Sequence, residues 1–91
     1  MAIYVVSCEF REPRQNSELF HKRLSAWSAV QGLESLWFID TPSSAAHIRD
    51  DLREFLSIHD GLFIGELSGV TAWHDLRENS DRYLQLRFAL K

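Results

Sequence analysis

The fold of this chain depends on how one stretch near its middle is read: Ala29-Val30-Gln31-Gly32-Leu33-Glu34-Ser35-Leu36-Trp37-Phe38-Ile39. As a continuation of the preceding helix, the stretch stays helical to Gln31 and Gly32 stops it, which leaves a single strand before the next helix. As two short strands joined by a turn at Glu34-Ser35, it supplies a pair of strands. We favour the second interpretation because it completes the order strand-helix-strand-strand-helix-strand, a common two-layer arrangement.

The residues before this stretch fit that order. The apolar, β-branched run Ile3–Cys8 predicts a buried strand. Phe20, Leu24 and Trp27 then recur at the spacing of one buried helical stripe, which predicts a helix from about Ser17 to Trp27.

The residues after it supply a second helix and a further strand. Thr41-Pro42 is typical of a helix start, since threonine can cap a helix and proline suits its first position. The helix that follows has an apolar face from Ala45 to Leu56, and Leu62–Leu67 reads as the next strand.

The end of the chain departs from the six-element order. Val70, Trp73 and Leu76 suggest a short helical segment, and the strict alternation from Tyr83 to Leu90 predicts an additional strand over about 82–90. An apolar edge strand needs a partner, so we expect it to pair with a second copy of the chain. The predicted fold is therefore α+β: a single ferredoxin-like two-layer domain over 1–91, with a fifth strand used in a homodimer.

Composition narrows the function classes. The chain has 91 residues and a net charge of −3, so it does not have the strongly basic composition of many nucleic-acid-binding proteins. Its one cysteine, Cys8, cannot form an internal disulfide or a cysteine-based zinc cluster within one chain. No window approaches 18 apolar residues and no basic leader precedes an apolar run, so we expect a cytoplasmic protein with no membrane partner.

Three short motifs carry a resemblance to a known family. They are the opening strand Ile3–Glu9, the segment Ser35–Ile39 and the segment Ile58–Leu67. In these, and in its predicted topology, the chain resembles the small subunit of the CRISPR adaptation complex and its relatives, the virulence-associated D ribonucleases and a SinR-like group.

The resemblance implies a homodimer whose open sheet faces pack together. It also implies a divalent metal, Mg²⁺ or Mn²⁺, held where the acidic residues that end the first strands of two copies meet. The matching residue is Glu9, where the family has aspartate, and Cys8 stands where the family pattern has tyrosine. Two facing carboxylates would repel each other unless a cation or a shared proton lay between them.

The candidate catalytic residues are Glu9 and Ser35. Alternation places Glu9 on the face of the first strand opposite Tyr4, Val6 and Cys8, so it can act as a metal ligand or acid/base group for phosphodiester cleavage. The alternative is a solvated strand-end carboxylate paired with Arg11. Ser35 could position a phosphate or a water beside Glu9, or it could simply be a turn serine.

Other polar residues also have both a functional and a structural interpretation. Cys8 could act as a nucleophile, but a lone cysteine in an apolar strand is more often a small core residue. A local basic edge over Arg11, Arg14, Lys22 and Arg23 could contact the phosphates of DNA or RNA, or it could be a solvated surface.

Two functions from different classes follow. The first is a small dimeric scaffold or interaction protein in a defence or toxin–antitoxin setting, associated with nucleic acid or with an integrase-like or antitoxin-like protein. The alternative is a metal-dependent endonuclease, a ribonuclease in particular, that uses paired Glu9 carboxylates at the dimer axis.

Overall fold

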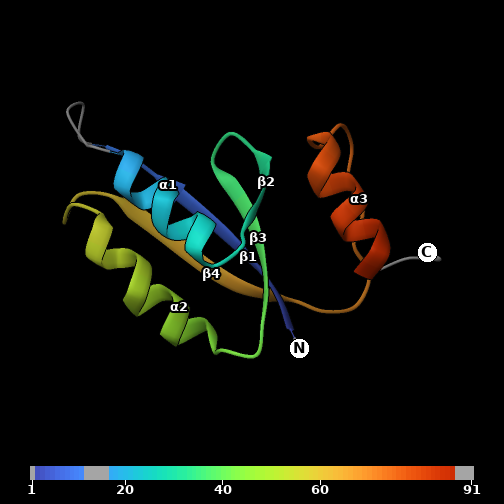
Figure 1. The fold of residues 1–91 in the computed structure, drawn as a ribbon, viewed down its shortest axis with the longest axis horizontal. Coiled ribbons are helices and arrows are strands. Elements are labelled where there is room, and N and C mark those ends of the chain that lie inside the picture. The colour runs from blue at the N-terminus through green and yellow to red at the C-terminus, as the bar shows by residue number, and fades with distance from the viewer. Residues whose placement is uncertain (1, 12–16, 88–91) are drawn as a thin grey trace.

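The computed structural model of the chain describes residues 2–11 and 17–87. The strands form a single sheet, and helices lie on both sides of it (Figure 1). The elements are β1 (Ala2–Glu9), α1 (Ser17–Ala26), β2 (Val30–Leu33), β3 (Leu36–Thr41), α2 (Ala45–Leu52), a one-turn 3-10 helix (Arg53–Phe55), β4 (Gly61–Leu67) and α3 (Glu78–Arg87).

The four strands form one antiparallel sheet in the order β2-β3-β1-β4. The two central strands are β1 and β3, and Val6 of β1 lies opposite Trp37 of β3 on one side and Ile64 of β4 on the other. The predicted α+β class and the division of residues 29–39 into two strands are confirmed. The arrangement is consistent with a ferredoxin-like sandwich.

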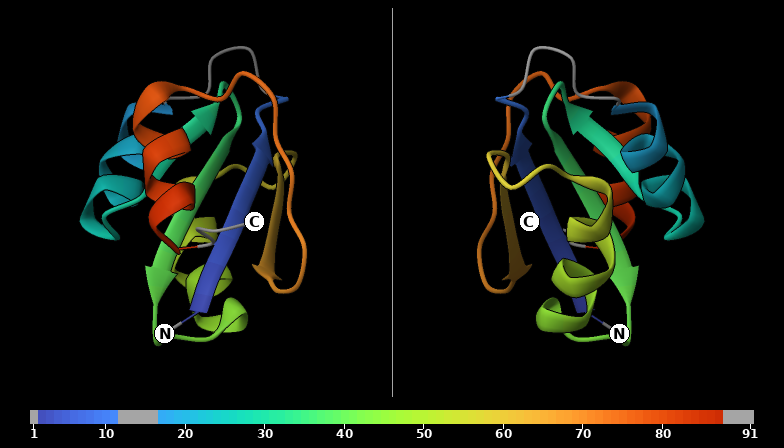
Figure 2. Two further views of the ribbon diagram at one scale, coloured as in Figure 1. Left: turned by 90° about the vertical axis from the view of Figure 1, so that its right-hand side faces the viewer. Right: turned by 90° about the vertical axis from the view of Figure 1, so that its left-hand side faces the viewer.

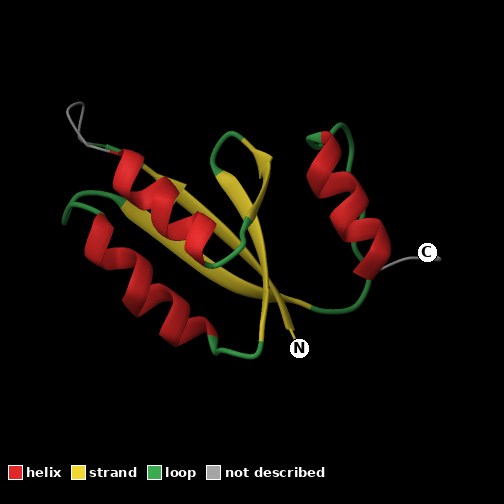
Figure 3. Ribbon diagram, in the orientation of Figure 1, coloured by secondary structure: helices red, strands yellow, loops and turns green. Residues whose placement is uncertain are grey.

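The first face of the sheet carries the main core. Alternation directs Tyr4, Val6 and Cys8 of β1 toward this face, as the sequence predicts, and α1 and α2 cover it (Figures 1 and 3). The core residues are those of β1 together with Phe20, Leu24, Trp37, Ile39, Ile48 and Leu52. The apolar stripe of α1 thus lies where its spacing predicts.

The start of α2 differs from the prediction. Thr41 is the last residue of β3, where it is buried and lies opposite Ala2, so it does not cap the helix. Ser44 does so instead: its hydroxyl oxygen accepts a hydrogen bond from the backbone N–H of His47 at 3.1 Å. Hydrogen-bonded pairing with β1 extends β3 by two residues beyond Ile39, to Thr41. The helix therefore begins later in the chain than the sequence predicts.

The predicted fifth strand over 82–90 is wrong across its described part, because Glu78–Arg87 is a helix; residues 88–90 lie outside the described residues. Leu84 is 2% exposed whereas Leu86 is 74% exposed. A strand would place both on one face, but residues two apart on a helix point in nearly opposite directions. The pairing of a C-terminal strand with a second copy therefore loses its structural basis.

Helix α3 lies on the second face of the sheet, opposite α1 and α2, over its β2–β3 half (Figure 2). Ile3, Phe38 and Leu84 are buried on this side. The helix is also held by an ion pair, in which Arg87 Nε donates to Asp40 Oδ2 at 2.8 Å. The chain thus covers part of the face that was expected to pack on a partner.

The segment between β4 and α3 is an irregular loop and not the short helix that Val70, Trp73 and Leu76 suggested. Gly69 and Asp75 have φ angles of 79° and 60°, in the left-handed region that interrupts a right-handed helix. Val70 is 93% exposed, so it does not contribute to an apolar helical face. None of the helices within the described ranges is long and apolar enough to cross a membrane.

Candidate functional site

The predicted site residue Glu9 is engaged in an ion pair at the end of β1. Its Oε1 accepts from Nη2 of Arg11 at 2.9 Å and from Nε at 3.1 Å. The Arg11 backbone N–H donates to Asp60 Oδ1 at 2.8 Å, and the guanidinium also reaches the carbonyl of His59. Both side chains of the pair are largely exposed. Glu9 therefore has the arrangement of a strand-end carboxylate paired with Arg11.

Ser35 comes to the same end of the sheet. Its carbonyl oxygen accepts from the N–H of Cys8 at 3.2 Å, one residue before Glu9. The structure thus brings the two predicted catalytic residues into the same neighbourhood. Within residues 2–11 and 17–87, no group of three or more His, Cys, Asp or Glu side chains is arranged to hold a metal ion. A metal bound by Glu9 stays a prediction.

Cys8 is a core residue. Its side chain is buried, and burial, with a smaller contribution from the Asp60 charge, raises the pKa of the thiol to about 11. The thiolate is the nucleophilic form of cysteine, so a thiol that stays protonated at neutral pH is inert. The arrangement supports the interpretation of Cys8 as a small apolar packing residue.

The predicted basic edge is largely balanced by carboxylates. Arg11 holds Glu9, and Arg23 makes two hydrogen bonds to Asp51, at 2.7 and 2.8 Å. Lys22 is exposed on α1, and Arg14 lies outside the described residues. Phosphate binding by this edge would have to compete with ion pairs that already exist, and it stays a prediction.

Asp51 joins the two helices on the first face and yields a pH-dependent prediction. Arg23 and, to a lesser degree, the Trp27 indole N–H hold the pKa of Asp51 below its ordinary value of 3.8, against the opposing effect of partial burial. Because the folded-state pKa is lowered, the contribution to stability is present above about pH 3.8 and is lost as the pH falls through the folded-state value.

We expect Asp51→Asn to lower the free energy of unfolding by about 1 kcal/mol at pH 6. The difference from wild type should shrink toward pH 3, as measured by urea unfolding across that range. Asp50→Asn is the control, because Asp50 is exposed and pairs with Arg49 beside it on the same helix. An effect of Asp51→Asn that does not change with pH would contradict the assignment.

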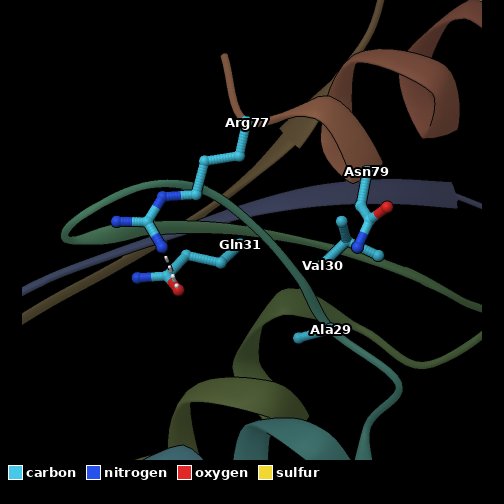
Figure 4. Close-up of a pocket in the computed structure, with 5 residues that line it drawn as sticks. All are labelled: Ala29, Val30, Gln31, Arg77 and Asn79. Carbon is cyan, nitrogen blue, oxygen red and sulfur yellow. Dashed lines mark hydrogen bonds between the residues drawn. The ribbon is translucent and has the colours of Figure 1, made fainter.

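The two edges of the sheet differ in how they are protected. Strand β2 is only four residues long and contains a register shift between Gln31 and Leu33. The backbone N–H of Arg77 also donates to the carbonyl of Gly32 at 3.2 Å, and Arg77 Nη1 donates to Gln31 Oε1 at 3.0 Å. A pocket of about 550 Å³ lies beside this edge and is lined by both polar and apolar side chains (Figure 4). Short length, irregularity and cover are the features that keep a sheet edge from pairing.

Strand β4, at the other edge, lacks these protective features among residues 2–11 and 17–87. It is seven residues long, Gly61-Leu62-Phe63-Ile64-Gly65-Glu66-Leu67, with no lysine or proline and a single charge. Three large apolar side chains are exposed along this part of the chain: Ile58 before the strand, Phe63 within it and Val70 after it. We call the outer edge of β4, together with these three side chains, the β4 surface. A long apolar edge of this kind is a site for strand pairing.

The ring of Phe63 lies against Gly65 on the second face of the sheet. A Cβ atom built on Gly65 would be 2.8 Å from Cε2 of Phe63 and 3.7 Å from Cγ1 of Val5. The missing side chain of Gly65 is thus what lets the ring lie down on the sheet. Phe63 is nevertheless 63% exposed, which leaves an apolar surface open to a partner.

Sequence reasoning assigned Leu62–Leu67 to a strand but did not identify the β4 surface. The signal was present, because Leu62, Phe63 and Ile64 are consecutive apolar residues and one of any two neighbours in a strand must face away from the helices. Which strand lies at the edge is a property of the sheet order and cannot be read from one strand.

Comparison with known proteins does not add a family to this description. No protein-family model matches the chain, and neither a curated protein nor a solved structure matches it.

Proposed function

We propose that the chain is a small interaction protein that works as a homodimer, assembled through the β4 surface. The observation that carries the proposal is the contrast between the two sheet edges. The β2 edge is short, irregular and hydrogen-bonded to Arg77, whereas the β4 edge is long, apolar and lacks those safeguards. Pairing of β4 with its counterpart would join two four-stranded sheets into one of eight strands.

The sequence of β4 is self-complementary for such pairing. In an antiparallel pair centred on Ile64, Phe63 lies opposite Gly65 of the partner subunit, over which the partner's own Phe63 ring lies, so the two rings would meet on the second face of the sheet. Glu66 lies opposite Leu62 of the partner subunit, so the only charge in the strand does not face its own copy. A two-fold symmetric interface requires this kind of complementarity of a surface with itself.

The exposed residues on either side of the strand lie at equal distances in sequence from Ile64. Ile58 is six residues before Ile64 and Val70 is six residues after it. A two-fold axis at Ile64 therefore brings Ile58 of one copy and Val70 of the other to the same end of the interface. Their association would cover side chains that are 94% and 93% exposed in the single chain.

This pairing disfavours the nuclease that uses two Glu9 carboxylates at the dimer axis. Glu9 lies opposite Gly61 in the sheet, three residues from Ile64. The two Glu9 residues would be six residues apart along the strand direction, or about 20 Å at 3.4 Å per residue. The ion pair with Arg11 also occupies the carboxylate. A nucleic-acid partner, implied by the resemblance, would have to compete for Arg11 and Arg23, each of which already holds a carboxylate.

Sedimentation equilibrium tests the proposal. We expect wild-type protein to have twice the 10.6 kDa mass of the chain. Phe63→Glu should raise the dimer dissociation constant by at least about 30-fold, since it replaces a central aromatic contact with a charge. Leu86→Glu is the matched control, because Leu86 is also apolar and largely exposed but lies on α3. A wild-type monomer at high concentration, or equal effects of both variants, would overturn the proposal.

A further inference from the structure

A mainly apolar cavity lies between the second face of the sheet, the 68–77 loop and α3. Its volume is about 310 Å³. Side chains from all three segments line it, chiefly Leu36, Phe38, Leu67, Trp73, Leu76 and Leu84. It belongs neither to the main core, which is on the other face, nor to the interface centred on the outer edge of β4.

The walls of the cavity are held in place by specific contacts. The indole N–H of Trp73 donates to Asp81 Oδ1 of α3 at 2.6 Å, which ties the loop to the helix and sets the orientation of the ring. Phe38 and Leu84 are buried, so their positions are determined by packing. Arg77, at the end of the loop, is fastened to β2 through its hydrogen bond to Gly32. A cavity with fixed walls loses little conformational entropy when a ligand enters.

The size and lining of the cavity define the ligand it would accept. The cavity is partly open to solvent, so a ligand could enter it directly. For scale, an enclosed apolar cavity of about 150 Å³ is large enough to bind benzene. The present cavity is about twice that volume, which matches two fused rings. Among the described residues that line the cavity, the polar side chains are those of Thr71 and His74, and none is a carboxylate. A cation would lose its hydration there without gaining a charged partner.

We propose that this cavity is a binding site for a neutral, fused two-ring aromatic molecule. The rings would pack against Phe38, Trp73 and the leucine side chains. A single hydrogen-bonding group on the ligand would point toward Thr71 and His74. Ligand sites of this kind combine an apolar lining with a few polar groups that orient the ligand. The proposal does not depend on dimer formation.

Titration of the ¹⁵N-labelled protein with indole tests it. We expect a dissociation constant on the order of 0.1–1 mM for a ligand of this size. The shifted amide signals should belong to the 68–77 loop, α3 and the centre of β3. Signals that shift instead around Ile58 and Phe63, or no saturable shift, would overturn the proposal.

Two controls separate the cavity from general apolar binding. Ala72→Trp, at the lining of the cavity, should weaken indole binding at least tenfold, whereas Ala46→Trp, at an alanine that is also exposed but lies on α2, should not change it. Tryptamine, an indole that carries an ammonium group, should bind wild-type protein at least tenfold more weakly than indole, a comparison that does not depend on how any variant folds. Equal binding of both compounds, or equal binding by both variants, would contradict the site.

Discussion

Phe20→Ala is expected to lower the free energy of unfolding by about 3–5 kcal/mol. Phe20 is fully buried where α1 meets the sheet. Its ring packs edge to face against Phe10, with centroids 5.5 Å apart, and against Trp37, with centroids 6.0 Å apart. Truncation would remove these contacts and leave a cavity that the surrounding strands cannot close.

The effect is large relative to the total stability of a small domain. Proteins of this type have a free energy of unfolding of about 5–15 kcal/mol, and small domains tend toward the lower end of this range. Urea unfolding followed by circular dichroism measures the change. Leu19→Ala is the control, because Leu19 is the preceding residue and 51% exposed, and it should cost no more than about 0.5 kcal/mol. Equal losses for the two variants would contradict the assigned face of α1.

Leu84→Asp is expected to release α3 from the sheet. Leu84 is 2% exposed on the side that faces the sheet, so the variant would place an unpaired carboxylate in an apolar environment. The cost would be about 3 kcal/mol or more, and detachment of the helix is the route that avoids it. Amide hydrogen exchange should show loss of protection in α3, and binding of a hydrophobic dye should rise as Phe38 and Ile3 become accessible.

Leu86→Asp is the matched control and also separates the two interpretations of the C-terminal segment. In a strand, Leu84 and Leu86 share a face, and the two substitutions would have similar effects. In α3, Leu86 is 74% exposed, so Leu86→Asp should change stability by no more than about 0.5 kcal/mol. Comparable loss of protection in both variants would contradict the helix.

The local patterns of the first two-thirds of the chain predicted its elements well. The run Ile3–Cys8 forms β1, and the spacing of Phe20 and Leu24 marks the buried stripe of α1. The interpretation of residues 29–39 as two strands also holds. In each case neighbouring residues repeat with the period of the structure they form, so a short window contains the whole signal.

The C-terminal segment shows that a short window of sequence can predict the wrong type of element. Alternation over Tyr83–Leu90 is typical of a strand, yet the described part of this segment is helical and buries Leu84 while exposing Leu86. The helix is stabilised by residues far away in the sequence, including Asp40, which pairs with Arg87. The same limit applies to Arg23, whose predicted role in a basic edge is countered by Asp51, 28 residues later.

Some features of the candidate sites could be predicted from the sequence, and others depend on the tertiary structure. A carboxylate at the end of β1 and an arginine two residues later were visible as a pair in the sequence, and Glu9 and Arg11 do form an ion pair. The exposure of Phe63 and the cavity beside α3 depend on which strand lies at the edge and on which elements cover the second face. Periodicity along the chain determines the type and buried side of most individual elements, since it needs only near neighbours. The free edge and the covered half of the sheet were decided by the packing of distant segments, because burial is a property of the assembled layers and not of any one of them.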